Sequence, residues 1–208
     1  MKHIKTLGLL AIAAMALVAF VGTTSASATT KFTAGKVGAK FITTQIEKDK
    51  FTVTGSNVEF SGIEYEGTTA ALESTEQTVM PVYSGCTAFG FSASVTPENC
   101  KYILTINGTV HIERTNTSTP CKITITVANV FAHCMVTVTA PQTVENALSY
   151  TNGANNDIVI TTSTNAIKAM VEESTGLCPL TVDNEKEHTS EYHAKTTVQA
   201  EGTTLAVD

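Results

Sequence analysis

The sequence lacks tryptophan altogether, and charged residues make up only 15% of its 208 residues. It has no cluster of lysine and arginine, and this absence argues against nucleic acid and anionic lipid surfaces as partners. It also has no Gly-x-Ser-x-Gly elbow, no His-Glu-x-x-His pair and no Cys-x-x-Cys pair. These gaps exclude the commonest hydrolase and zinc motifs. Leucine and glutamate never cluster at helical spacing, so little favours a helical fold.

The only long apolar run lies near the start of the chain, from Leu9 to Val21, between two lysines and a stretch of small residues that ends at Ala28. This order is typical of a secretory signal. The run is shorter than the roughly 18 to 20 residues that a membrane-spanning helix requires. We therefore expect residues 1–28 to be a signal peptide. Residues 29–208 are then expected to form a single secreted domain with no transmembrane segment and a net charge of −8.

Threonine is abundant and occupies 34 of the 180 residues after Ala28. Its branched Cβ atom suits the surface of a β-sheet. Alternation of apolar and polar residues recurs along the chain, most clearly over 51–53, 58–65, 121–127, 134–140 and 157–162. Closely spaced turn residues favour hairpins and meanders over parallel crossovers. The sequence predicts an all-β fold: a two-layer antiparallel β-sandwich, with a closed β-barrel as the alternative.

Two local features can be predicted more closely. Val58 and Phe60 share one strand face while Ile63 and Tyr65 share the other, so a β-bulge is expected at residues 61–62.

The dipeptide Asn107-Gly108 indicates a hairpin with a two-residue type I′ turn, which needs a positive φ angle at both positions. This turn would place Ile103 on one face with Val110 and Ile112. The other face would carry Tyr102, Leu104 and Ile106, so we expect this hairpin to be covered on both sides.

The chain after residue 28 contains five cysteines, so an exported protein would hold disulfides and at least one unpaired thiol. The candidates are Cys86, Cys100, Cys121, Cys134 and Cys178. If residues 88–95 and 100–106 form a hairpin, Cys100 faces Val95 and Cys86 lies roughly 30 Å away, whereas bridged Cα atoms lie within roughly 7 Å. A meander would bring Cys100 and Cys121 to one end and Cys86 and Cys134 to the other. We predict a Cys100–Cys121 disulfide first, with Cys178 competing for Cys86.

Two clusters of polar side chains are candidates for a metal site or a catalytic site. Glu191 and His193 would share a strand face near His188 and could hold zinc with a third ligand, although the spacing matches no known zinc motif. Glu64 and Glu66 also share a face, at a spacing close to the roughly 5 to 5.5 Å between the carboxylates of retaining glycosidases. Solvated strand faces explain both groups more simply. We therefore predict no catalytic residue, no cofactor site and no metal site.

Four segments together resemble a group of exported actinobacterial proteins of unknown function. The most specific is Cys86-Thr-Ala-Phe-Gly-Phe91, and the others are Thr96-Pro-Glu-Asn-Cys100, His133-Cys-Met-Val-Thr-Val138 and Gly176-Leu-Cys-Pro179. The resemblance covers roughly residues 51–197. It implies an extracellular fate and a shared cysteine framework, and it implies no activity.

Three functions follow from these observations. The leading one is a non-catalytic, secreted or envelope-associated β domain with a binding or structural role, whose partner is an extracellular or envelope ligand. The second is a carrier that encloses a small apolar ligand, for which Phe60, Phe89, Phe91 and Phe131 would line an internal cavity. The third is an extracellular hydrolase that uses the paired carboxylates.

Overall fold

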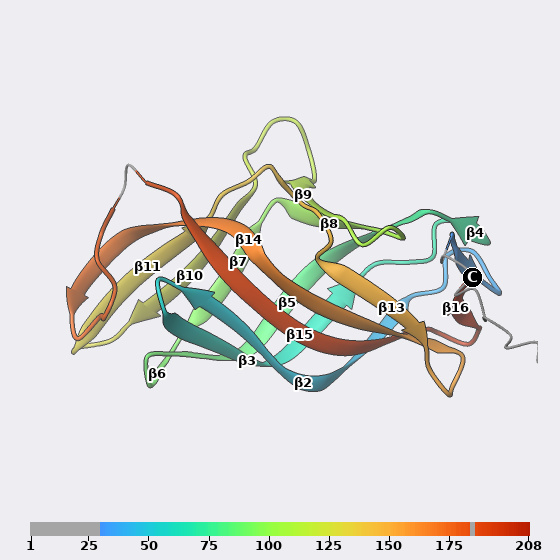
Figure 1. The fold of residues 1–208 in the computed structure, drawn as a ribbon, viewed down its shortest axis with the longest axis horizontal. Coiled ribbons are helices and arrows are strands. Elements are labelled where there is room, and N and C mark those ends of the chain that lie inside the picture. The colour runs from blue at the N-terminus through green and yellow to red at the C-terminus, as the bar shows by residue number, and fades with distance from the viewer. Residues whose placement is uncertain (1–29, 184–185) are drawn as a thin grey trace, which may run out of the picture.

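A computed structural model describes residues 30–183 and 186–208, and every regular element in these two ranges is a β-strand (Figure 1). The all-β prediction is therefore confirmed. The predicted signal peptide, residues 1–28, lies outside the described residues. The part of the chain that the structure describes contains no helix long and apolar enough to cross a lipid bilayer.

Most strands belong to one large sheet in which every pairing is antiparallel. Its spatial order is β12 (Gln142–Val144), β9 (Val110–Arg114), β8 (Cys100–Thr105), β5 (Glu76–Ala88), β3 (Ser56–Glu66), β2 (Phe41–Val53), β15 (His188–Ala200), β14 (Asp157–Gly176), β11 (Ala132–Val138), β10 (Lys122–Ala128) and β7 (Ser94–Glu98). Outside this order, β13 (Leu148–Asn152) pairs with β14, and β6 (Phe91–Ser92) pairs with β5.

The large sheet curls into a half-barrel, with the long strands β14 and β15 running along it (Figure 1). At one edge, β7 follows β6 along the chain, and the Ala93 backbone N donates a hydrogen bond of 2.9 Å to the Cys86 carbonyl oxygen of β5. At the other edge, the Lys168 backbone N of β14 donates a 3.0 Å hydrogen bond to Gln142 Oε1 of β12. Both edges of the sheet therefore turn back onto interior strands. This curl agrees with the sandwich-like or barrel-like fold expected from the sequence.

A small second sheet lies at one end of the molecule (Figure 1). It consists of β16 (Leu205–Val207), β1 (Phe32–Ala34) and β4 (Glu73–Ser74), in that order. Phe32 pairs with Val207 in antiparallel register. The first and last described segments therefore lie side by side.

Two apolar clusters fill the interior of the curl. The first includes Val127, Cys134 and Val171, and the second includes Phe32 and Leu205. The two clusters meet at a boundary formed by three partly buried side chains that pack against both. These side chains are Tyr83, Tyr102 and Val110. The candidate site lies at this boundary.

The turn between β8 and β9 differs from the predicted one. Gly108 has a φ of 90°, but Asn107 is not among the residues of positive φ, so the type I′ geometry does not form. Leu104 pairs with Val110, and the Thr105 backbone N donates to the Thr109 carbonyl oxygen at 2.9 Å. The loop therefore has three residues and a glycine at its left-handed position.

This longer loop shifts the strand register by one residue and so corrects the predicted faces. Tyr102 pairs with Ile112 and Leu104 pairs with Val110, and all four side chains line the interior. Ile103 pairs instead with His111. The shift explains why the predicted grouping of Ile103 with Val110 was wrong.

The expected change of phase in β3 is present. Phe60 and Ile63 are both buried, so the alternation of side chains breaks at residues 61–62. The neighbouring strand β5 changes phase opposite it, where Gly85 has a φ of 57°. The paired irregularity lets both strands keep apolar side chains inside on either side of the break.

The Cys100–Cys121 disulfide is present, with 4.8 Å between Cα atoms. The prediction that Cys86 pairs with Cys134 or Cys178 was wrong, because those two cysteines pair with each other, with 5.7 Å between Cα atoms. The reason is that β14 extends beside β11 as far as Gly176, which carries Cys178 to Cys134. Cys86 is free and buried.

Val95 was expected to face Cys100 across a hairpin, and this prediction was wrong. Val95 belongs to β7 and pairs with Ile125 of β10. The chain turns after Ala88, so that β6 pairs with β5, and residues 94–98 then run beside β10 and not beside β8. The predicted pairing of Val127 with Cys134 is confirmed.

Candidate functional site

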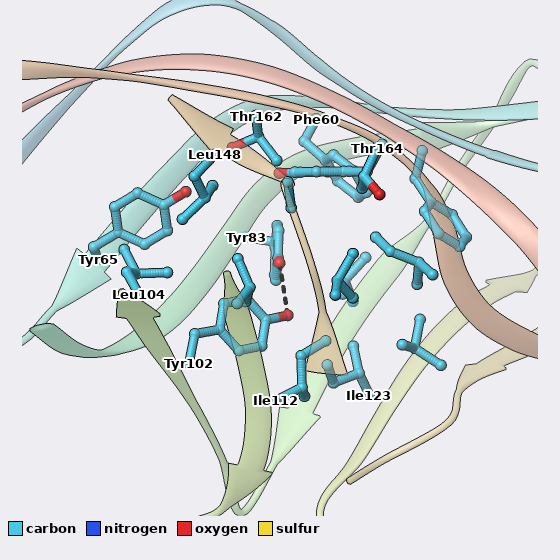
Figure 2. A pocket seen from close by; sticks show the side chains of 18 of the residues that line it. Phe60, Tyr65, Tyr83, Tyr102, Leu104, Ile112, Ile123, Leu148, Thr162 and Thr164 are labelled. Atoms are coloured by element: carbon cyan, nitrogen blue, oxygen red, sulfur yellow. Dashed lines mark hydrogen bonds between the residues drawn. The ribbon is translucent and has the colours of Figure 1, made fainter. Parts of the chain in front are cut away.

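A cavity of about 80 Å³ lies at the boundary between the two apolar clusters (Figure 2). Strands from the middle and from both edges of the large sheet contribute to its lining. Its walls are mostly aliphatic and aromatic, and its polar groups are tyrosine and threonine hydroxyls, including those of Thr162 and Thr164. Engineered apolar cavities of roughly 150 Å³ bind benzene. Without rearrangement this cavity admits a molecule of only a few heavy atoms.

The chain's tyrosines gather around this cavity. Four of the five line it, namely Tyr65 of β3, Tyr83 of β5, Tyr102 of β8 and Tyr192 of β15. The fifth, Tyr150 of β13, lines a neighbouring cavity of about 20 Å³, which Tyr65 also lines. Each tyrosine occupies an inward position of its strand. A tyrosine offers a large apolar surface together with one hydroxyl, so the lining can both pack against a ligand and form hydrogen bonds with it.

Hydrogen bonds hold four of these five hydroxyls in place. Tyr83 Oη lies 3.0 Å from Tyr102 Oη (Figure 2). Tyr192 Oη donates to Asp49 Oδ2 at 3.0 Å, and Tyr150 Oη donates to the Thr105 carbonyl oxygen at 3.0 Å. Hydrogen bonds of this kind fix the orientation of the rings on the cavity wall.

The hydroxyl of Tyr65 is different, because within residues 30–183 and 186–208 no group forms a hydrogen bond with it. Its backbone N donates to Thr43 Oγ1 at 3.0 Å. This bond fixes the strand, but the ring is not fixed by a hydrogen bond of its hydroxyl. Figure 2 shows the Tyr65 side chain beside Leu104, with its oxygen directed toward Leu148. This hydroxyl is available to a ligand.

Burial raises the pKa of every tyrosine, to about 12 for Tyr102 and well above the ordinary value of 10.0 for Tyr83 and Tyr192. These three side chains nevertheless keep some accessible surface. The two observations agree if that surface faces the cavity and not bulk water. The hydroxyls are therefore neutral at physiological pH, and the cavity suits an uncharged molecule.

Asp49 of β2 supports the wall from behind Tyr192. Its side chain is completely buried, and its Oδ1 atom has no hydrogen-bond partner among the described residues. Burial raises the pKa of this carboxyl, while hydrogen bonds from Gln45 and Tyr192 partly oppose the rise. The carboxyl group positions the Tyr192 ring by accepting its hydroxyl.

The paired carboxylates that the sequence suggested as a catalytic site lie away from the cavity. Glu64 and Glu66 are exposed on the outer face of β3, where they pair with Val82 and Met80 of β5. Neither belongs to the lining of the cavity.

Of the side chains considered as zinc ligands, Glu191 and His193 are exposed, whereas His188 is half-buried. Glu191 Oε2 and His193 Nε2 lie 4.0 Å apart, as expected for side chains on one strand face. His188 Nε2 lies 3.9 Å from Asp183 Oδ2 instead. Among the residues that the structure describes, no group of three or more histidine, cysteine, aspartate or glutamate side chains could hold a metal ion.

Of the four phenylalanines expected around a cavity, only Phe60 lines it, 5.1 Å from the Tyr83 ring centroid. Phe89 and Phe91 pack against the first apolar cluster instead. Phe131 is 65% exposed at the turn between β10 and β11. The sequence reasoning missed the tyrosines as a group. Their common inward placement within alternating strands was the signal that could have found them.

No known family model, curated protein or solved structure matches this chain, so the candidate site is defined by its own geometry alone.

Proposed function

We propose that this chain is a secreted, non-catalytic β domain that binds a small, uncharged and largely apolar molecule in the tyrosine-lined cavity. The observation that carries the proposal is the convergence of Tyr65, Tyr83, Tyr102 and Tyr192 on one cavity. An apolar wall with a few placed hydroxyls is the usual composition of a small-molecule site. The partner is then an extracellular ligand and neither a nucleic acid nor a membrane.

The secreted location is supported by two features of the chain. The disulfides Cys100–Cys121 and Cys134–Cys178 persist in oxidising compartments. The apolar run from Leu9 to Val21 resembles a secretory signal. Both features agree with a protein that works outside the cell.

The fluorescence of the protein itself offers a direct test. Because the chain has no tryptophan and all five tyrosines line the two cavities, tyrosine emission reports on occupancy. Butanol, which does not absorb with tyrosine, is titrated into the purified domain. We expect a saturable change in emission.

A cavity-filling variant separates binding from general solvent effects. Val110→Phe places a ring in the cavity and should abolish the saturable change. Val82→Phe makes the same substitution at a side chain that is 41% exposed on β5 and should bind as the wild type does. Thermal unfolding confirms that both variants fold. A wild type without saturation, or a Val110→Phe variant that still saturates, would contradict the proposal.

A further inference from the structure

The 20 Å³ cavity adjoins the larger one, and the same two side chains line both. Tyr65 and Leu104 belong to each lining, so they form the partition between the cavities. Their side chains lie next to each other at one side of the larger cavity (Figure 2). Displacement of these two side chains would bring the two spaces into contact.

The partition contains the one tyrosine whose ring is not held by its hydroxyl. The rings of Tyr83, Tyr102, Tyr150 and Tyr192 are each fixed by a hydrogen bond of 3.0 Å. Within the two described ranges the Tyr65 hydroxyl forms none. A rotation of Tyr65 therefore breaks no hydrogen bond of its hydroxyl, whereas the same motion in the other four would break one.

The smaller cavity contains a polar group without a partner. Gln77 of β5 lies directly across from Leu104 of β8 and lines the smaller cavity. Its side chain is only 5% exposed, and its Oε1 atom has no hydrogen-bond partner among the described residues. A buried amide oxygen left unpaired is costly, so a ligand that donates a hydrogen bond to it would be favoured.

We propose that Tyr65 and Leu104 form a movable partition, and that the ligand is an elongated, uncharged aliphatic molecule whose polar end binds the Gln77 amide. This inference rests on the proposed function, because it assigns a ligand class to the same site. The aliphatic part occupies the larger cavity beside Tyr83 and Tyr102. The polar end passes the partition and lies among side chains such as Val79 and Leu205.

Straight-chain primary alcohols from butanol to octanol test the length of the site. A short alcohol fills the larger cavity alone, whereas a long one must displace the partition. Each methylene that enters an apolar cavity should raise the affinity roughly fourfold. We expect the dissociation constant to fall steadily up to octanol.

Val79→Leu is the variant that isolates the smaller cavity. Val79 is 3% exposed and lines this cavity but not the larger one, so the added methylene occupies space that a long ligand needs. Octanol should bind about fourfold more weakly to the variant than to the wild type, while butanol binds equally well. Val82→Leu on the outer face of β5 is the matched control and should bind both alcohols as the wild type does.

The role of Gln77 is tested by comparing octanol with butanol. In the wild type the octanol hydroxyl donates to Gln77, and in Gln77→Leu it has no partner. Octanol should therefore lose about tenfold in affinity when Gln77 is replaced, whereas butanol, which occupies the larger cavity alone, should bind as it does to the wild type.

The possible outcomes separate the two proposals. If butanol binds but affinity stops rising before octanol, the partition is fixed and this inference fails, while the proposed function stands. The same holds if Val79→Leu or Gln77→Leu has no selective effect on the long ligands. If no alcohol binds saturably, both proposals fail. A steady rise to octanol that both variants reduce selectively supports both.

Discussion

Tyr83 and Tyr102 place their hydroxyl oxygens 3.0 Å apart across the boundary between the two apolar clusters, although their strands pair only over residues remote from Tyr83. The contact joins β5 to β8 from within the curl. It also fixes two rings of the cavity wall with respect to each other. Its contribution to stability can be measured directly.

Tyr83→Phe and Tyr102→Phe should each lower the free energy of unfolding by about 1 kcal/mol, because each leaves a buried hydroxyl without its partner. The double variant should cost little more than either single one, which gives a coupling energy of about 1 kcal/mol. Urea unfolding of the four proteins supplies the values. Tyr65→Phe, which removes a hydroxyl without a hydrogen bond, serves as the control and should not lower stability. Additive losses would show that the two hydroxyls act independently.

Alkaline titration should reveal the shared burial of the tyrosines. The pKa of each tyrosine is raised above its ordinary value of 10.0 by burial, so the folded state favours the neutral form. This contribution to stability is complete below pH 10 and is lost as the pH rises above it. We expect no tyrosinate absorbance at about pH 11, followed by ionisation of all five groups in one step with unfolding. Gradual ionisation before the loss of circular dichroism would contradict this expectation.

Asp49 should destabilise the protein at neutral pH. Its pKa is raised above the ordinary 3.8 by burial, so its stabilising contribution is complete below that pH and is lost as the pH rises through the folded-state pKa. Asp49→Asn should therefore raise Tm at pH 7, by about 2 to 4 °C for each kcal/mol gained. The advantage should vanish below about pH 3.8. The exposed Glu64→Gln is the control and should leave Tm unchanged at both pH values. A lower Tm for Asp49→Asn at pH 7 would show that the ionised carboxyl is needed.

The two disulfides should contribute unequally to stability. Cys134 and Cys178 are separated by 44 residues, and Cys100 and Cys121 by 21. The loss of chain entropy in the unfolded state corresponds to about 4 kcal/mol for the longer loop and about 3 kcal/mol for the shorter one. Replacing each pair by alanine and comparing denaturant midpoints tests the order. Equal losses would indicate that packing of the sulfur atoms outweighs loop closure.

Local patterns in the sequence were sufficient to predict individual strands. Alternation located β10 and β11, and it also gave the pairing of Val127 with Cys134. The phase change at residues 61–62 could be predicted because Phe60 and Ile63 are both large and apolar. In each case the information lies within a few residues of the chain.

The order of strands was not accessible in this way. A two-residue turn was predicted at Asn107-Gly108, yet the structure has a three-residue loop, and this difference of one residue exchanged the two faces of β9 relative to β8. The pairing of Cys134 with Cys178 depends on the length of β14, which no local pattern sets. The cavity depends on the first outcome, because Val110 and Ile112 share a face with Tyr102 and Leu104 only in the observed register.

The antiparallel ladder between Phe32 and Val207 determines how the molecule responds to force. Both strands leave the small sheet at the same side, so a pull on the two ends loads the outermost hydrogen bond first and the next one only after it breaks. Such a ladder peels apart at low tension, whereas strands drawn lengthwise past each other share the load among all their bonds. The small sheet is therefore expected to unfold at a lower force than the curled sheet, so that it separates before the cavity is strained.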